Sequence, residues 1–211
     1  MSMKLLCLFL FITIPFFALY SQNNAVDEIN KYCEELNGNI PTEQNEPGNY
    51  LFHKIIFETN VRAIGLQITE VKFFYSQPEE EVTEDGEGTK FKRKYLPPPK
   101  VTVNYNIAAS EIVSAEYYYR NGNLILYHSI SKGAYYCTEE NYYYDNNKLV
   151  KVKVTLPADC KDKETLESRP AFERSDNFSK TDLRLSDKHL KTAAEYKKIF
   201  DNLVELEKLG K

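Results

Sequence analysis

The chain has 211 residues, of which 42% are hydrophobic and 27% are charged. This balance is typical of a globular protein and excludes a wholly disordered chain or a collagen-like fibre. The formal net charge of −4 provides no basic surface of the kind that nucleic-acid binding requires.

Residues 1–21 have the pattern of a secretory signal peptide. Lys4 precedes an apolar run from Leu5 to Ala18, which is too short to span a bilayer. We predict cleavage after Ser21, which leaves residues 22–211 as a single domain. The alternative is an N-terminal membrane anchor, which the short length disfavours. We expect an exported protein (periplasmic, cell-surface or secreted) with no transmembrane segment in the mature chain.

Removal of residues 1–21 leaves three cysteines, which can form only one intramolecular pair. An oxidising destination permits a disulfide, and Cys137 and Cys160 are the favoured pair because both lie in or beside a β-rich region. Cys33 is expected to be a buried free thiol. A nucleophilic Cys33 is the disfavoured alternative, since no positive neighbour in the sequence supports it.

An amphipathic helix is predicted over Asn24–Leu36. Asn24 can cap its first turn and Gly38 is expected to end it. Its apolar face consists of Val26, Ile29, Cys33 and Leu36. A turn-rich link follows over residues 39–49.

Strand patterns dominate from residue 50 to about residue 154. Tyr50–Glu58 is apolar on both faces, so we expect a central strand or one that is covered on both sides. In Ile64–Tyr75 the apolar residues change parity, which predicts a β-bulge near Thr69 and Glu70.

An acidic stretch, Pro78–Lys90, is expected to form a long solvated hairpin loop. A calcium site is the alternative, although the carboxylates do not have the spacing of an EF-hand loop. Pro97, Pro98 and Pro99 then separate this loop from the next strand.

An internal repeat predicts two β-hairpins. Glu116–Leu126 is echoed by Asn141–Lys151, and each copy has an aromatic strand, a two-residue turn and an aliphatic strand. Asn121-Gly122 favours a type I′ turn, and Asn146-Asn147 is a weaker version of it. The predicted opposing pairs are Tyr119 with Leu124, Tyr117 with Leu126, Tyr144 with Leu149, Tyr143 with Val150, and Asp145 with Lys148.

The C-terminal part is predicted as an irregular excursion over residues 155–186 and a second amphipathic helix over Asp187–Leu209. Its predicted apolar stripe contains Leu190, Ala193, Ala194, Phe200, Leu203 and Leu206. The fold class is therefore α+β, an antiparallel β-meander with an N-terminal and a C-terminal helix, both expected on one face of the sheet.

The segments Tyr117–Leu124 and Tyr142–Leu149 resemble the "YYFDNGKLI" hairpins of small uncharacterised exported bacterial proteins. Ala63–Gln67, leading into Phe73–Tyr75, is similar to an earlier strand of those proteins. The resemblance covers about half of the chain and implies an α+β protein of the bacterial envelope. It carries over no catalytic residues.

Three scattered histidines offer little for catalysis or metal binding, and we predict no metal and no cofactor. His128 is expected to share a strand face with Leu124, Leu126 and Ile130, the usual setting of a hydrogen-bonded core histidine. The alternative is a small hydrolase or isomerase in which His128 acts with Glu116 or Glu139.

The tyrosine runs favour a non-enzymatic binding module. If both helices cover one face of the sheet, the other face displays tyrosines, and we predict that Tyr118, Tyr127 and Tyr143 share it, with Arg120 nearby. The partner would be a protein or an envelope component. The alternatives are that these rings only stabilise neighbouring strands, and that the protein has a purely structural role in the envelope.

Overall fold

The computed structural model describes residues 24–40, 50–62, 65–76, 79–85, 88–107, 111–133, 137–157, 160 and 171–209. The side chains of residues 79–93 and 107 lie outside this description. The predicted signal peptide, its cleavage site and the acidic side chains considered for calcium therefore lie outside the described residues.

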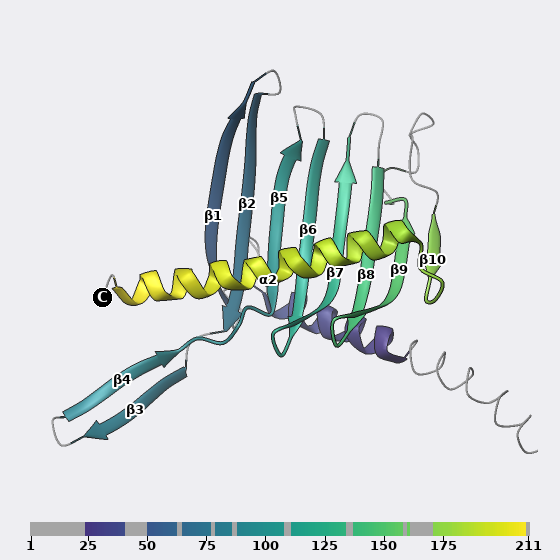
Figure 1. Cartoon of the computed structure of the whole chain (residues 1–211). Coiled ribbons are helices and arrows are strands. Elements are labelled where there is room, and N and C mark those ends of the chain that lie inside the picture. The colour runs from purple at the N-terminus through teal and green to yellow at the C-terminus, as the bar shows by residue number, and fades with distance from the viewer. Residues whose placement is uncertain are drawn as a thin grey trace, which may run out of the picture.

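An antiparallel sheet of eight strands forms the centre of the protein (Figure 1). Its strand order is β1-β2-β5-β6-β7-β8-β9-β10. The strands are β1 (Tyr50–Val61), β2 (Gly65–Ser76), β5 (Lys100–Ile107), β6 (Glu111–Arg120), β7 (Asn123–Lys132), β8 (Cys137–Asp145), β9 (Lys148–Thr155) and β10 (Phe172–Arg174). A separate two-stranded hairpin, β3 (Glu79–Asp85) with β4 (Gly88–Lys94), occupies the stretch expected to be a solvated hairpin loop.

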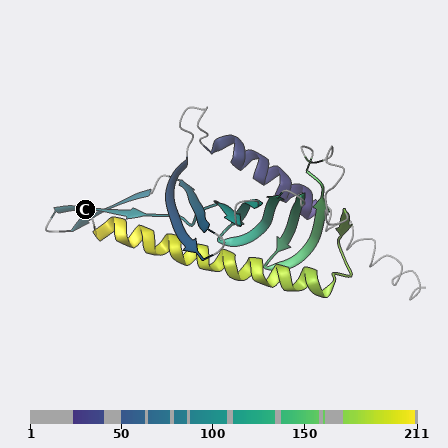
Figure 2. The ribbon, with the colours of Figure 1, turned by 90° about the horizontal axis from the view of Figure 1, so that it is seen from above.

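Two helices cover opposite faces of the sheet (Figure 2). The N-terminal helix, residues 24–39, packs on one face, and α2 (Lys180–Leu209) packs on the other. The α+β class is confirmed, but the expectation that both helices share one face is wrong. Both faces of the aromatic strands are apolar, so each face requires its own cover.

The two hairpin turns form as the sequence predicts. Asn121 and Gly122 have φ angles of 53° and 76°, and Asn146 and Asn147 have 49° and 62°. These positive values are those that a type I′ turn requires at both central positions. The second turn therefore closes without the usual glycine, because asparagine tolerates the left-handed region.

One extra residue follows the turn in each hairpin and changes the register. Tyr119 opposes Leu124, but a shift between Tyr118 and Tyr119 leaves Ile125 without an opposing residue. The second hairpin repeats this shift, leaving Val150 as its extra residue. The observed pairs are Tyr117 with Tyr127, Tyr118 with Leu126, Tyr143 with Lys151, Tyr144 with Leu149, and Asp145 with Lys148. The predicted pairs Tyr117–Leu126 and Tyr143–Val150 are therefore wrong.

The strand β1 lies at the edge of the sheet, not at its centre. Leu51, Phe52, Ile56 and Phe57 are each exposed by 42–50%. Apolar residues on both faces of this strand thus do not mean that both faces are buried. The expectation of a central strand, or of one covered on both sides, is wrong.

The predicted bulge near Thr69 and Glu70 is also absent, since β2 pairs with β1 in one continuous register. The change of parity has another cause. Leu66 and Ile68, which suggested it, are exposed by 53% and 41%. Apolar side chains at the surface mislead a face assignment that assumes they are buried.

Helix α2 begins at Lys180, seven residues before the predicted start at Asp187. Ser179 caps it: its hydroxyl accepts a hydrogen bond from the Asp182 N–H at 3.1 Å, and its own N–H donates to Asp182 Oδ2 at 2.9 Å. This reciprocal pair is a capping box. At the other end of the chain, the N-terminal helix continues through Gly38, so that glycine does not end it.

Asp182 is fully buried at this cap, and its Oδ2 also lies 2.6 Å from Arg174 Nη1. Because Arg174 belongs to β10, this one carboxylate fixes the short edge strand to the start of α2. Burial alone would raise the pKa of Asp182, but hydrogen bonds from Ser179 and Arg174 lower it below its usual value.

We expect Asp182→Asn to lower the free energy of unfolding by about 1–3 kcal/mol at pH 7, because Arg174 and the cap lose a charged acceptor. A lowered folded-state pKa means that this stabilisation is present above about pH 4 and is lost as the pH falls through the folded pKa. Urea unfolding at pH 7 and in 0.5-unit steps from about pH 4 downward measures both effects. The exposed control Asp201→Asn should change little, and a difference between native and variant chains that stays constant at every pH would contradict the assignment.

Candidate functional site

The predicted tyrosine surface is not exposed. Tyr118, Tyr127 and Tyr143 have exposed fractions of only 2%, 8% and 7%. They also do not share a face, because Tyr118 and Tyr143 pack under the N-terminal helix whereas Tyr127 packs under α2. The extra residue Ile125 causes this separation, since it shifts the parity of β7 relative to β6. All three rings belong to the buried cores on the two faces of the sheet, the placement expected if they stabilise neighbouring strands.

Arg120, the fourth predicted binding residue, attaches the N-terminal helix to the sheet. Its guanidinium carbon lies 4.6 Å from the centre of the Tyr32 ring, and one of its nitrogens donates to the Glu28 carbonyl at 3.3 Å. The Tyr32 hydroxyl in turn donates to the carbonyl of Tyr119 at 3.0 Å. These contacts fix the position of Tyr32.

A groove of about 440 Å³ lies beside these contacts, at the end of the sheet where the β6–β7 turn is located. We call it the proline–tyrosine groove; it is lined by Tyr32, Tyr50, Ser76, Leu96, Pro97, Pro98, Pro99, Tyr119, Asn121 and Gly122. Three prolines and three tyrosines thus meet at one place, although they are widely separated in the sequence.

Backbone contacts hold the proline wall of this groove. The Tyr119 N–H donates to the carbonyl of Pro99 at 2.8 Å, which ties the proline segment to β6. Proline has a fixed φ, so the wall loses little conformational freedom when a ligand binds. From the sequence the prolines are favoured as a spacer, with a polyproline ligand as the alternative, because nothing local shows that Tyr32 and Tyr119 lie beside them.

A second groove of about 460 Å³ lies on the other side of the same turn, between β7 and α2. It shares Tyr119 and Gly122 with the first groove, and Lys197, Lys198 and Asp201 give it a charged rim. The Lys197 amine approaches Gly122 so closely that a Cβ there would lie 3.1 Å from it. The turn glycine therefore has little space around it as well as a positive φ.

A partly buried ion pair lies between the N-terminal helix and the sheet. The Lys100 side chain is only 8% exposed, and its Nζ contacts Glu116 Oε1 at 2.7 Å and Asn37 Oδ1 at 2.8 Å. The Tyr118 hydroxyl donates to the other oxygen of Glu116 at 2.5 Å. Burial alone would raise the pKa of Glu116, but the Lys100 charge and the two hydrogen bonds lower it.

His128 lies on the same face of the sheet, on β7, directly opposite Glu116 of β6. Its side chain is 22% exposed; Nδ1 is 2.9 Å from Asn141 Oδ1 and 3.9 Å from Glu139 Oε1. Leu124 is on the opposite face, so the predicted environment of His128 is wrong at that residue. An imidazole beside a carboxylate can exchange protons, but the residues that line the two grooves do not include His128.

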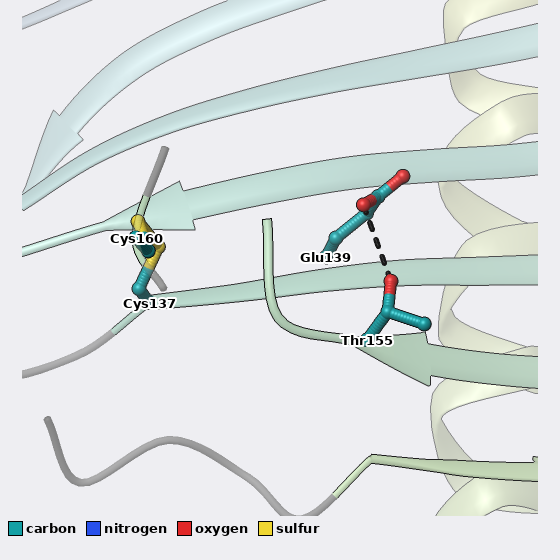
Figure 3. The surroundings of a disulfide bond; sticks show 4 residues. All are labelled: Cys137, Glu139, Thr155 and Cys160. Carbon is teal, nitrogen blue, oxygen red and sulfur yellow. Dashed lines mark hydrogen bonds between the residues drawn. A yellow bond between two sulfur atoms is a disulfide. The ribbon is translucent and has the colours of Figure 1, made fainter. Parts of the chain in front are cut away.

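The structure joins Cys137 to Cys160, the pair that the sequence favours. Their Cα atoms are 6.4 Å apart, and the bond links the start of β8 to the segment after β9. Figure 3 shows it near the ends of these strands, where the Thr155 hydroxyl donates to Glu139 at 3.2 Å. Cys33 is a buried free thiol, and burial raises its pKa to about 12.

Comparison with protein-family models, curated proteins and solved structures finds no match to this chain. Among the residues that the structure describes, no three histidine, cysteine or acidic side chains are grouped so that they could hold a metal ion. Within the same residues, no helix has the length and apolarity needed to cross a membrane.

We expect Lys100→Met to loosen the N-terminal helix, because it leaves the half-buried Glu116 without its cation. The labelling rate of Cys33 by a thiol reagent at pH 8 reports this, since the thiol is protected while the helix is docked. The rate should rise at least about tenfold, which corresponds to about 1.4 kcal/mol of helix docking.

Lys31→Met is the matched control, because Lys31 lies on the same helix with a side chain that is 77% exposed. Its labelling rate should equal that of the native chain. Equal rates in Lys100→Met and the native chain would show that the ion pair does not hold the helix.

Proposed function

We propose that the protein is an exported binding module that holds a segment of a partner protein in the proline–tyrosine groove. The observation that carries this proposal is the meeting of Tyr32, Tyr50 and three prolines around one open volume of about 440 Å³, whose lining Tyr119, only 5% exposed, completes. That volume is within the range of about 300–1,000 Å³ found for ligand sites.

The lining suits the apolar or aromatic side chains of a peptide. Tyrosine combines a large apolar surface with a polar tip and is enriched among residues that dominate binding energy. Leu96, exposed by 40%, adds an aliphatic contact at the rim. Ser76 and Asn121 supply polar groups that can fix the orientation of a peptide backbone.

The groove is also preorganised. The hydrogen bonds Tyr32–Tyr119 and Tyr119–Pro99 connect the N-terminal helix, β6 and the proline segment before any ligand is present. A site that is already ordered loses less entropy on binding, which favours affinity for a given contact area.

Export is supported by two independent features. The first 21 residues have the pattern of a secretory signal peptide. A disulfide between Cys137 and Cys160 is the kind of bond that persists in an oxidising compartment. The resemblance of the tandem hairpins to those of exported bacterial proteins points the same way.

The groove is tested by selecting peptides from a random display library on the mature chain, then measuring each affinity on two variants. Ser76→Trp places a large ring in the groove, and we expect it to weaken the selected peptides at least about tenfold, a loss of about 1.4 kcal/mol. Leu183→Trp is the matched control, because Leu183 is exposed by 48% on α2 and lies outside the groove lining. Peptides that bind both variants as well as the native chain would refute the groove as the binding site.

Export is tested by expressing the full chain in a bacterium and determining the N-terminus of the accumulated protein. We expect it to begin at Gln22, with Cys137 and Cys160 oxidised. A chain that keeps Met1 and remains in the cytoplasmic fraction would contradict the signal-peptide assignment.

A further inference from the structure

Within the described part of the chain, no strand pairs with the outer edge of β1. β1 pairs with β2 on one side and is the last strand of the sheet on the other (Figure 1). It is 12 residues long, whereas β10 at the opposite edge has three. Natural sheets usually shorten, bulge or charge their edges, because open edges pair with other chains. β1 is long and without a register shift, and it carries four exposed apolar side chains.

We propose that β1 pairs antiparallel with β1 of a second copy of this chain, about a two-fold axis that passes midway between the Ile56 residues of the two copies. Such an axis is perpendicular to the sheet, so the α2 faces of the two copies lie on the same side of the joined sheet. Opposing residues are then both odd-numbered or both even-numbered. With Ile56 at the centre, Lys54 opposes Glu58 of the second copy and Glu58 opposes its Lys54. Ile55 then opposes Phe57, and Leu51 opposes Val61.

The neighbouring registers lack this complementarity. A centre at Ile55 or Phe57 places Glu58 against Phe52 or Ile56, and a centre at Lys54 or Glu58 places like charges directly opposite each other. Opposite charges across a strand pair are favourable, whereas like charges are destabilising. The sequence of β1 therefore selects the register centred on Ile56.

The surrounding charges support the same register. Lys54 Nζ lies 2.6 Å from Glu70 Oε2, and Lys72 Nζ lies 3.2 Å from the other oxygen of the same carboxylate, Oε1. Two cations thus surround one anion on this face of the edge. Glu58 of the second copy would supply the second anion, next to Lys54.

The C-terminal end of α2 provides a further contact. Glu207 Oε2 lies 3.5 Å from His53 Nε2. The C-terminal end of α2 extends past β1 (Figure 1). Leu206 and Leu209 at this end are exposed by 63% and 84%. In the paired arrangement His53 opposes Thr59 of the second copy, so these leucines lie over the face that carries its Phe57, itself exposed by 49%.

The two α2 helices do not collide in this arrangement. His53 is three residues from Ile56, which corresponds to about 10 Å along a strand. The two-fold axis therefore separates the helices by about 20 Å, twice the usual packing distance of 8–10 Å. The C-terminal end of each α2 can therefore lie over β1 of the other copy without contacting the other α2.

Disulfide trapping tests the register. In the mature chain, Ile56→Cys places two thiols across the axis with Cα atoms about 4.5–5.5 Å apart, within reach of a disulfide. Thr59→Cys is the matched control, because six residues of offset separate its two copies by about 20 Å. Cys33 is buried and does not compete. We expect Ile56→Cys to form a covalent dimer under a mild oxidant such as oxidised glutathione, and Thr59→Cys to remain monomeric on a denaturing gel.

Charge reversal tests the same interface without a cysteine. Glu58→Lys creates two like-charge pairs, and we expect it to raise the dimer dissociation constant at least about tenfold in sedimentation equilibrium. Asp187→Lys, an exposed position on α2, is the control and should leave that constant unchanged. The native chain should sediment as a dimer at tens of micromolar.

Three outcomes overturn the proposal: a native chain that is monomeric at about 100 micromolar, equal trapping of Ile56→Cys and Thr59→Cys, or a dimer that is insensitive to Glu58→Lys. The last two would indicate self-association through another surface. None of these outcomes depends on whether peptides bind the proline–tyrosine groove.

Discussion

The alternation of tyrosines between the two faces of the sheet is the constraint on which the rest of this structure depends. Tyr117 and Tyr119 point to one face and Tyr118 to the other, and all three are buried. A strand that carries large apolar rings on both sides cannot leave either side in water without losing their burial. The two helices therefore lie on opposite faces, and the protein has three layers (Figure 2).

Each layer must also satisfy the polar tips of these rings. The Tyr119 hydroxyl donates to the carbonyl of Ala193 on α2 at 3.1 Å, whereas the Tyr118 hydroxyl donates to Glu116. On the second face this requirement brings the carboxylate of Glu116 into a half-buried position, and Lys100 neutralises it. The ion pair under the N-terminal helix thus follows from placing tyrosine there, and without Lys100 the partly desolvated carboxylate would destabilise the docked helix.

Local chemistry could be predicted from the sequence, whereas the arrangement of the layers could not. Asn121 and Gly122 define their turn through backbone preferences of their own, so the hairpin follows from a few residues. The extra residue at Ile125 has no local signature, and it reverses the face of every residue that follows it in β7. This one residue explains why the sequence predicts Tyr127 on the face of Tyr118, whereas the structure places it on the opposite face.

The prediction that β1 is a central or covered strand is wrong for a related reason. Phe52 and Ile56 are residue types that are usually buried in a core. The sequence does not show directly which strand lies at the edge of the sheet. The capping box at Ser179 and Asp182, in contrast, has a local signature, Ser-X-X-Asp, but it lies in a polar stretch that does not by itself predict a helix. The groove depends on contacts between Tyr32, the prolines and Tyr119, which only the folded chain brings together.

The two proposed interaction surfaces occupy different parts of the molecule, and this separation has a physical consequence. The groove touches β1 only at Tyr50, the first residue of the strand, whereas the pairing register is centred on Ile56. A dimer built through β1 would therefore keep two grooves, related by the two-fold axis and facing opposite ends of a continuous sheet. Two copies of a segment on one partner assembly would then bind with an effective concentration set by their spacing. A low affinity of each single groove is then sufficient for tight binding of the dimer, because the second contact forms within an existing complex.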